Sequence, residues 1–514
     1  DRRARGAVVA SGKIDFTDAG CFELPYAPVA EALLPEGPWK VVEGGVCAAK
    51  GFKVAAYKAG LRAKGTRADC ALIVADEDAT CAGIFTTNIM CAAPVTFCKK
   101  QLAGKPTARA LLINAGQANA ATGDQGAADA RATAEELSKS LGVAEEDILL
   151  MSTGVIGKRI KLDKLMPAIP ILSANVENST AAANAAATAI CTTDLVRKTV
   201  AIEVQIGGKT VRMGGMAKGS GMIHPNMATM LGMVTCDADV TPEVWRNITS
   251  RAGAASFNQI SVDGDTSTND SLVCFASGKA GNAKITSVDS AEGKLLEQAL
   301  TAICRGLAKA IAWDGEGATC LIECNVSGAA DDEDARVIAR SVVCSSLAKA
   351  AIFGHDPNWG RLLAAIGRAG IIFGDPDDQP GNGQSHHHGK EEIHAGEGRH
   401  GGRADFGGEA IGRHVAADRH VHVAEHELRR QIDGRDRQNG GDQKPLVQRA
   451  HDVLRCAEPD EIGADDGGDD THAANQQWQA HQVEERRIAD IDQQRRQHHR
   501  RTHGHHVSLE QIGR

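Results

Sequence analysis

The sequence predicts a mixed α/β fold over residues 1–374, built as a pair of domains, from two kinds of pattern. Four short apolar runs have the length and composition of buried strands, at 71–75, 110–114, 148–152 and 320–324. Helical patterns lie between and after these runs. Strands and helices that alternate along a chain are typical of α/β architectures.

The remaining elements follow from turn residues, caps and composition. Residues 198–213 alternate around Gly207-Gly208, which predicts a β-hairpin. Alanine-rich stretches at 127–142 and 179–191 predict helices. A further helix is expected after Ser290, a helix-capping residue type, because apolar residues then recur at steps of three and four: Leu296, Leu300, Ile303, Leu307 and Ile311.

Composition excludes several classes of function. The 514 residues include 57 Lys+Arg and 66 Asp+Glu, a net charge of −9, so the basic footprint of a nucleic-acid-binding protein is missing from the sequence. No apolar stretch approaches the ~18 residues of a membrane span. The 14 cysteines form no CxxC pair and are interpreted as free core thiols. Residues 1–37 are interpreted as an N-terminal extension, because DRRARGAVVAS resembles the remnant of an Arg-rich organelle transit peptide.

The chain changes character near residue 375. Of the 19 histidines, 17 lie beyond residue 380, whereas Cys456 is the only cysteine there. Residues 378–514 carry too few apolar side chains to offset the entropy of ordering a chain. Three interpretations remain open: a disordered tail, a histidine-rich metal-binding tract, and translation in a wrong reading frame. The last is favoured, because the change falls inside well-patterned sequence.

The segment GGMAKGSGMIHPNMATMLG, residues 214–232, is the most unusual stretch. Its glycines permit backbone geometries that other residues avoid, and Pro225 restricts His224 to extended geometry. One interpretation is a long, tight connection. The other is an activated threonine, since cleavage of the bond before Thr229 frees an α-amino group, with a pKa of about 7.7–8.0, that can act as the base.

This segment resembles the self-cleavage motif of the glutamate N-acetyltransferases, also called ornithine acetyltransferases, of arginine biosynthesis. Further blocks resemble the family in the family's order: VEGGVCAAKGF (42–52), GIFTTN (83–88), INAGQANAATG (113–123), STGVIG (152–157), TTDLV (192–196), SVDGDTSTND (261–270), AWDGEGATC (312–320) and GHDPNWGR (354–361). The resemblance is greatest to plant and algal members. It implies a two-lobed α/β fold with layered sheets and flanking helices, of N-terminal-nucleophile-like architecture.

The resemblance also implies roles for individual residues. The bond between Ala228 and Thr229 breaks, which divides the enzyme into an α part, 38–228, and a β part, 229–377. Thr229 is then both nucleophile and, through its amine, general base. The oxyanion hole and the substrate-binding positions match these residues: Thr153 and Gly154 for the first, and Thr192, Lys218 and Glu316 for the second.

Each candidate has a plainer interpretation. In the plainer interpretation, Lys218 is a solvated surface lysine, Glu316 is a turn residue, and Thr153 is the end of a strand. Asp263, Asp265 and Asp270 suggest a metal site, but their spacing lacks the glutamate of a calcium loop, so a structural turn network is preferred. His224 is a second candidate base.

The implied reaction is ping-pong acetyl transfer from N2-acetyl-L-ornithine to L-glutamate, with acetyl-CoA as a further donor in some members. No metal or organic cofactor is implied. The expected assembly is a heterotetramer of two α and two β chains, in the chloroplast, with mitochondrion or cytoplasm as alternatives. Family members also use an Asn and a Ser or Thr near their C-terminus to bind substrate, and no residue of 378–514 matches them.

Two rival functions are kept. One is a self-cleaving aminopeptidase or amidase of similar architecture, which would pass the acyl group to water. The other is an inactive, truncated product of the acetyltransferase.

Overall fold

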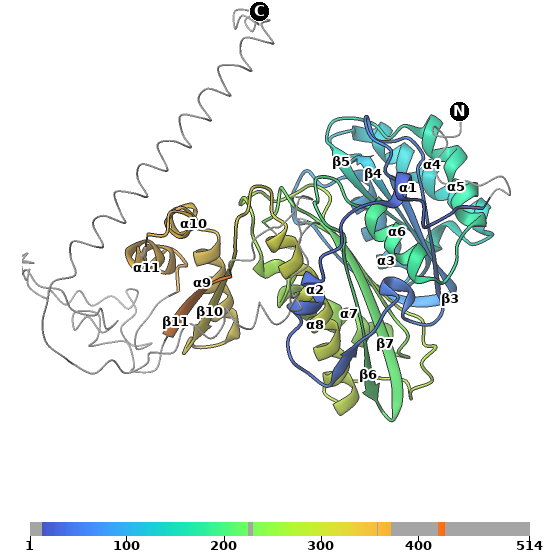
Figure 1. The fold of residues 1–514 in the computed structure, drawn as a ribbon. Coiled ribbons are helices and arrows are strands. Elements are labelled where there is room, and N and C mark those ends of the chain that lie inside the picture. The colour runs from blue at the N-terminus through green and yellow to red at the C-terminus, as the bar shows by residue number, and fades with distance from the viewer. Residues whose placement is uncertain (1–12, 225–229, 357, 372–419, 427–514) are drawn as a thin grey trace, which may run out of the picture. The chain divides into compact units, whose positions relative to one another are not determined.

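The computed structural model describes residues 13–224, 230–356, 358–371 and 420–426 (Figure 1). Nine strands form one mixed sheet, and within the described residues their order is β1-β6-β7-β8-β9-β3-β4-β5, with β2 paired to β3. The strands are β1 (Trp39–Val41), β2 (Phe52–Tyr57), β3 (Cys70–Phe85), β4 (Thr107–Gln117), β5 (Ile148–Val155), β6 (Lys198–Ile206), β7 (Lys209–Lys218), β8 (Leu231–Cys236) and β9 (Ser271–Ala276).

Strand β3 belongs to both halves of this sheet. Its first half, from Cys70, pairs with β2 and β4, and its second half, Thr80–Phe85, pairs with β9. A register shift between Val74 and Ala79 separates the two halves. Five strand spacings separate β7 from β5, about 24 Å in a flat sheet, yet Lys218 of β7 lies 3.1 Å from Thr153 of β5. The sheet is therefore folded into two layers.

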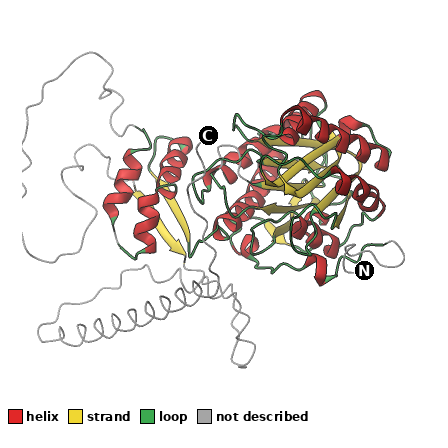
Figure 2. Ribbon diagram, turned by 90° about the horizontal axis from the view of Figure 1, so that it is seen from above, coloured by secondary structure: helices red, strands yellow, loops and turns green. Residues whose placement is uncertain are grey.

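Helices cover the outer side of each layer (Figure 2). The β2–β5 layer packs against α3 (Ala93–Gly104), α4 (Gly123–Leu141), α5 (Leu162–Ala174) and α6 (Thr180–Ala189). The second layer packs against α7 (Pro242–Ala254) and α8 (Ala291–Trp313). Side chains of β9 alternate between the two cores: Val273 and Phe275 face the first layer, and Leu272 and Cys274 face α7 and α8. This period of two is what a strand between two apolar layers requires.

The N-terminal segment contributes to the core. It contains α1 (Ala19–Phe22) and α2 (Val29–Ala32), and Phe16 and Phe22 are buried in the first core. The expected extension of residues 1–37 is therefore part of the folded body from residue 13 onward, because its apolar side chains are taken out of water. Residues 1–12, which carry the transit-peptide-like sequence, lie outside the described residues.

After α8 the chain forms a smaller group of elements. Strand β10 (Leu321–Ser327) is followed by α9 (Asp332–Val343), α10 (Ser346–Phe353) and α11 (Trp359–Gly367). Strand β11 (His420–His426) pairs antiparallel with β10 along all seven residues. The expectation that the tail from residue 378 lacks structure is wrong for this strand, because the unpaired edge of β10 offers backbone hydrogen bonds to any extended segment. The rest of the tail lies outside the described residues.

The elements predicted from sequence patterns are confirmed. The apolar runs lie in β3, β4, β5 and β10, and the alanine-rich stretches form α4 and α6. Both hairpin glycines have positive φ, +57° at Gly207 and +72° at Gly208, as this turn demands. The Ser290 side chain caps α8 by accepting a hydrogen bond from the amide of Gly293. The α/β class with layered strands and flanking helices is therefore confirmed.

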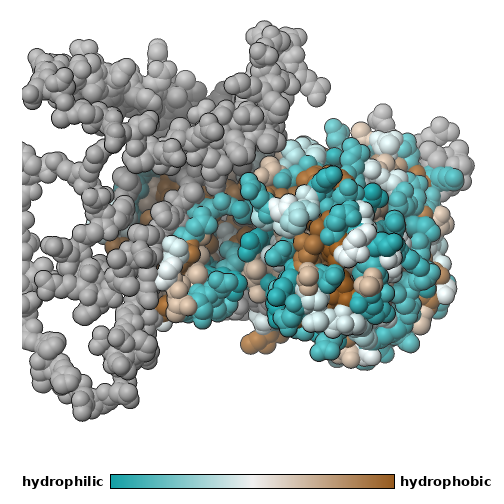
Figure 3. Space-filling model, turned by 90° about the horizontal axis from the view of Figure 1, so that it is seen from below, coloured by the Kyte–Doolittle hydropathy of each residue, from teal (hydrophilic) through white to brown (hydrophobic). Residues whose placement is uncertain are grey.

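The visible face of the body in Figure 3 is mostly hydrophilic, with smaller hydrophobic areas between. None of the helices in the described ranges has both the length and the apolar run that crossing a bilayer requires.

Phe275 should contribute strongly to stability, because it joins the two layers. It is 1% exposed, and its ring meets that of Phe52 edge-on with centroids 6.2 Å apart. We expect Phe275→Ala to lower the free energy of unfolding by about 3–5 kcal/mol. Phe353→Ala, at a side chain that is 68% exposed, should change it by less than about 0.5 kcal/mol. Urea denaturation of both variants tests this, and equal losses would contradict the layered packing.

Candidate active site

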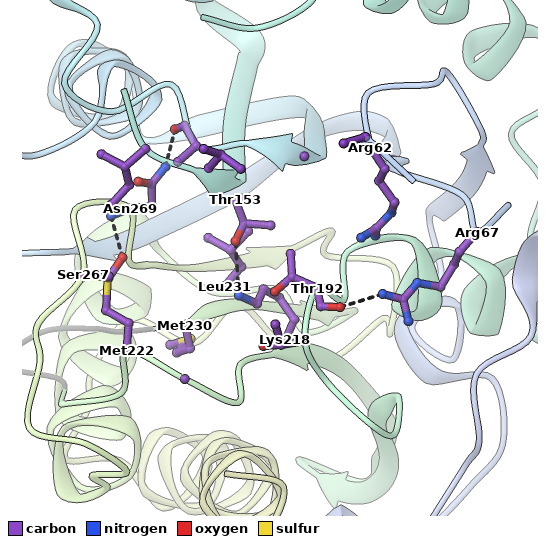
Figure 4. Close-up of a pocket in the computed structure, with 18 of the residues that line it drawn as sticks. Arg62, Arg67, Thr153, Thr192, Lys218, Met222, Met230, Leu231, Ser267 and Asn269 are labelled. Carbon is purple, nitrogen blue, oxygen red and sulfur yellow. Dashed lines mark hydrogen bonds between the residues drawn. The ribbon is translucent and has the colours of Figure 1, made fainter. Parts of the chain in front are cut away.

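A cavity of about 740 Å³ opens where several strand ends meet. Its wall includes the end of β5, the end of β7, the start of β8, and the segments 62–67 and 267–270 (Figure 4). The folding of the sheet at β3 brings these strand ends together, since β5 and the β7–β8 pair belong to different layers. Four of the predicted site residues line the cavity: Thr153, Gly154, Thr192 and Lys218.

Thr153 and Lys218 are in direct contact. The Lys218 ammonium donates a hydrogen bond of 3.1 Å to the Thr153 hydroxyl. Thr153 is 8% exposed and Lys218 is 9% exposed. Lys218 is therefore not the solvated surface lysine of the plainer interpretation. Its positive charge lies beside the hydroxyl that was expected to stabilise an oxyanion.

Gly154 occupies a position that accepts no other residue. Its φ is +127°, and a Cβ there would lie 2.4 Å from the carbonyl carbon of Gly116, its partner on β4. A side chain would therefore force the two parallel strands apart. The missing side chain also exposes the backbone at this point of the cavity wall, which suits a backbone N–H that must approach a substrate oxygen.

Asn269 ties the two layers together beside Thr153. Its amide nitrogen donates to the backbone carbonyls of Ala118, at 2.5 Å, and Ser152, at 2.8 Å. Asn269 is 6% exposed and lies two residues before the start of β9 at Ser271. It holds the end of β5 against the second layer and so helps to fix where Thr153 points.

Thr192 is held at the end of α6 by charged neighbours. Its amide donates to Asp194 at 2.9 Å, and its carbonyl accepts a 2.7 Å bond from Arg67. Arg62 donates to the carbonyls of Ala189 and Cys191 just before it. Cationic side chains at the C-terminus of a helix are favoured, because its last carbonyls carry partial negative charge.

A buried ion cluster lies behind the cavity. Lys198 donates to Asp194 at 2.6 Å and to Asp314 at 2.7 Å, and none of the three side chains is exposed. Asp194 also accepts a bond from the amide of Gly219. The cluster thus joins the Thr192 loop, the residue after Lys218 and the end of α8. Charges so deeply buried are tolerated only when paired.

The pKa directions reflect this pairing. Burial by itself would raise the pKa of Asp194, but the charges of Lys198 and Lys218 outweigh it, so this pKa lies below its ordinary value. Burial likewise opposes the charge of Lys198, but Asp194 and Asp314 hold its pKa above the ordinary value. Asp194 and Lys198 are therefore charged at neutral pH.

Glu316 reaches the cavity indirectly. It is exposed and does not itself line the cavity, but its carboxylate lies over Gly221, which does: a Cβ at Gly221 would meet the Glu316 oxygens at 2.6 Å. The amide of Glu316 donates to the Ser220 carbonyl at 2.7 Å. The turn after α8 therefore places a carboxylate beside the rim.

Asp263 anchors the loop that leads toward the predicted cleavage site. Its oxygens accept bonds from the amides of Met222, at 2.5 Å, and Ile223, at 2.9 Å, and from that of Asp265 at 3.0 Å. The preferred turn network is thus confirmed for Asp263. Met222 has a φ of +57°, a costly conformation for this residue type, so the loop is strained just before the segment of interest.

The contacts of His224 do not favour the role of general base. Its Nδ1 lies 3.2 Å from the Ser261 hydroxyl and 3.4 Å from the Cys344 sulfur. Burial, followed by the charges of Arg340 and Lys349, lowers its pKa. The imidazole is therefore neutral at physiological pH, and its Nδ1 lies between Ser261 and the residue that follows α9.

Ala228 and Thr229 lie outside the described residues. The residues on both sides of this gap are described, and Gly221, Met222 and Met230 line the cavity. Met230 is bonded directly to Thr229 and is followed by Leu231, where β8 begins. The predicted cleavage position therefore lies within a connection whose two ends border the cavity.

Sequence patterns did not reveal Arg62, Arg67, Asn269 or the ion cluster as parts of this site. Asp194, Asn269 and Asp314 were present in family-like blocks but had no assigned role. The arginines lie in GLRAKGTRAD, residues 60–69, whose dense glycine and basic content is the one available signal. Within the described residues, no group of three or more His, Cys, Asp or Glu side chains is arranged to hold a metal ion.

Comparisons with known proteins match most of the folded body. A model described as the ArgJ family matches residues 53–379. The "Arginine biosynthesis bifunctional protein ArgJ, chloroplastic" of Ostreococcus lucimarinus is 97% identical over 372 residues, which cover 72% of this chain and 81% of that protein. The protein of the same name from Sorghum bicolor is 57% identical over 348 residues, covering 68% and 75%. A crystal structure of ornithine acetyltransferase complexed with ornithine, from Mycobacterium tuberculosis, is 36% identical, with a TM-score of 0.35, and covers 37% of this chain and 100% of that chain.

Removing the central cation of the ion cluster should destabilise the fold in a pH-dependent way. We expect Lys198→Met to cost about 3–5 kcal/mol at neutral pH, because it removes the ammonium that pairs with both buried carboxylates. Their pKa values should then rise through burial. The deficit should consequently shrink as the pH falls toward about 4, where these carboxylates take up protons. Urea denaturation at several pH values measures it.

The exposed Lys209, on the same sheet, provides the control: Lys209→Met should show almost no deficit at any pH. A deficit for Lys198→Met that stays constant from neutral pH to pH about 4 would contradict the charge-pairing explanation.

Proposed function

Since the chain belongs to the ArgJ family of arginine biosynthesis, we propose that it moves an acetyl group from N2-acetyl-L-ornithine to L-glutamate through an acetyl-Thr229 intermediate. The observation that carries this proposal is the convergence of Thr153, Gly154, Thr192 and Lys218 on one cavity that also borders the residue after Thr229. The enzyme is thus an acyltransferase, and its substrates are small molecules.

Maturation comes first. The Thr229 hydroxyl attacks the Ala228 carbonyl, the acyl group moves from nitrogen to oxygen, and water hydrolyses the resulting ester. The positive φ of Met222 and the hydrogen bonds of Asp263 to residues 222 and 223 support this step, since they hold one end of the connection that contains the bond in a strained conformation. The cut separates residues 38–228 from 229–377, the α and β parts. Strands β7 and β8, on the two sides of the cut, pair through six residues, so the parts stay in one sheet.

Acetyl transfer then proceeds in two half-reactions. The Thr229 amine takes the hydroxyl proton while the hydroxyl oxygen attacks the acetyl carbonyl of the donor. The tetrahedral intermediate collapses, the proton passes to the departing amine, and ornithine leaves. In the second half-reaction the amine of glutamate attacks the acetyl-threonine ester and loses a proton to the Thr229 amine. N-acetyl-L-glutamate leaves and the hydroxyl is restored.

The oxyanion of each intermediate is assigned to the Thr153 hydroxyl and the Gly154 N–H. The hydrogen bond from Lys218 to Thr153 supports this role. It occupies the hydroxyl oxygen as an acceptor, which leaves the hydroxyl hydrogen directed to another acceptor. Lys218 is assigned a substrate carboxylate, Glu316 a substrate ammonium, and Thr192 a hydrogen bond to the substrate. Donors fixed in advance cost no reorganisation when charge develops.

Several finer properties belong to the same proposal. Acetyl-CoA is a second donor, no metal or organic cofactor takes part, and two α and two β chains form a heterotetramer. The relatives named above are described as chloroplastic, and we assign this chain to the chloroplast. The match to the family ends at residue 379, which supports an aberrant tail from residue 378 as the result of a changed reading frame.

Cleavage before Thr229 tests the first step. We expect the purified full chain to give two fragments on a denaturing gel, with Thr229 as the new N-terminal residue. Thr229→Ala should remain uncut, because it lacks the hydroxyl, and Thr229→Ser should retain some cleavage. A single band from soluble, folded protein of unaltered sequence would contradict self-cleavage and favour the inactive product.

Thr153 and Lys218 should affect different kinetic constants. The oxyanion exists only in the transition state, so Thr153→Ala should lower kcat by about 10²–10³ with little change in KM. Lys218→Ala should mainly raise KM, because binding a carboxylate stabilises the ground state as well. Acetyl transfer is measured in a chain that carries the C-terminal region of the Ostreococcus lucimarinus relative in place of residues 378–514.

A rise in KM alone for Thr153→Ala would remove it from the oxyanion hole. Release of acetate in place of glutamate-dependent transfer would favour the aminopeptidase or amidase alternative.

A further inference from the structure

Two arginines in the cavity wall have no role in the reaction described above. Arg62 and Arg67 both come from the loop between β2 and β3 and both line the cavity. Figure 4 shows them on the same side of the site, with Thr192 between Arg67 and Lys218. The wall therefore carries positive charge at a second place, apart from the ammonium that contacts Thr153.

Neither guanidinium group forms an ion pair within the described part of the chain, although Asp69 lies near Arg62 and both Glu23 and Asp270 also line the cavity. The hydrogen bonds of both guanidinium groups go to main-chain carbonyls: those of Ala68, Ala189 and Cys191 for Arg62, and those of Cys191 and Thr192 for Arg67. Burial, and next the charge of Arg67, lower the pKa of Arg62. Two like charges held together in a half-buried wall favour an anion beside them.

The loop is built to hold the pair in place. The carboxylate of Asp69, 1% exposed, accepts hydrogen bonds from four successive amides, those of residues 59–62. Its oxygens are thereby occupied by the backbone, although its charge still reaches Arg62. Arg67 makes both of its bonds through one terminal nitrogen, so the rest of its N–H fork is available to a ligand.

The two half-reactions need an anion subsite of this kind. Both substrates carry an α-carboxylate and an α-nitrogen, but the ornithine side chain ends in an ammonium and the glutamate side chain in a carboxylate. Glu316 suits the side-chain ammonium of ornithine. Lys218 is already in contact with Thr153 at the reacting centre. None of the residues assigned so far is therefore placed to bind the side-chain carboxylate of glutamate. Guanidinium groups bind carboxylates through paired, charge-assisted hydrogen bonds.

We propose that Arg62 and Arg67 form a subsite for the side-chain carboxylate of the acceptor amino acid, and that Arg67 determines acceptor specificity. The assignment rests on the proposed acetyl transfer to glutamate. Arg62, with three carbonyl partners, shapes the subsite and adds charge, whereas Arg67 contacts the ligand.

Calorimetric titration of the full chain with L-glutamate, L-glutamine and L-ornithine tests this assignment. Glutamine has the shape of glutamate without the side-chain charge. We expect Arg67→Gln to weaken glutamate binding about tenfold or more, the usual effect of losing a charged hydrogen bond. Glutamine binding should not change, and ornithine binding should stay equal or become tighter, because a like charge is removed. Arg67→Lys should lie between the two.

Arg109→Gln is the matched control. Arg109 also donates to two main-chain carbonyls, those of Ala75 and Asp76, but it does not line the cavity. This variant should bind all three amino acids like the original chain.

Three results would overturn the proposal. Equal weakening of glutamate and ornithine by Arg67→Gln would mean that Arg67 acts only by positioning Thr192. Ornithine binding without any glutamate binding in the original chain would exclude the subsite and leave the donor half-reaction standing, whereas binding of neither would count against the proposed function itself. Tighter binding of inorganic phosphate than of glutamate, lost in Arg67→Gln, would assign the subsite to another anion.

Discussion

The site depends on one strand that is shared by two layers. Because β3 pairs with β2 and β4 in its first half and with β9 in its second, the nine-stranded sheet folds over instead of lying flat. Lys218 and Thr153 then meet at 3.1 Å, although several strands separate them in the sheet order. The contact between these two side chains is a direct consequence of the fold, and the cavity lies beside it at the ends of β5 and β7.

The charged side chains behind the site are held in fixed positions because they are buried and paired. The cluster of Asp194, Lys198 and Asp314 is sealed from solvent and ties backbone amides of the Thr192 loop and of the end of β7 to fixed carboxylates. Such a cluster adds little net stability over an apolar core, but it allows few alternative arrangements. That restriction suits the proposed site, in which an ammonium, a hydroxyl and a backbone N–H have to be placed around one reacting carbon.

The position of the predicted cut relative to the sheet explains how a cleaved chain would keep its site. Strands β7 and β8 lie on the two sides of residues 225–229 and are paired in register from Met213 with Cys236 to Lys218 with Leu231. The backbone hydrogen bonds and both cores therefore cross the boundary between the α and β parts. A cut between Ala228 and Thr229 would therefore leave two parts within one folded body, and each part alone would expose a large apolar face.

The sequence by itself determined the element types, the family and the set of candidate residues, because each of these depends on local order along the chain. Periodicity located the strands and α8, Gly207-Gly208 located a turn, and family-like blocks pointed to Thr153, Lys218 and Thr229. Only the tertiary structure decided which charges face the cavity. Arg62 and Arg67 sit in an unpatterned loop whose direction is set by the buried Asp69, and the partners of Lys198 come from positions 4 and 116 residues away. The Lys198–Asp314 contact comes from the packing of α8 on β6, and the Lys218–Thr153 contact comes from the folding of the sheet at β3. No local sequence pattern encodes either arrangement.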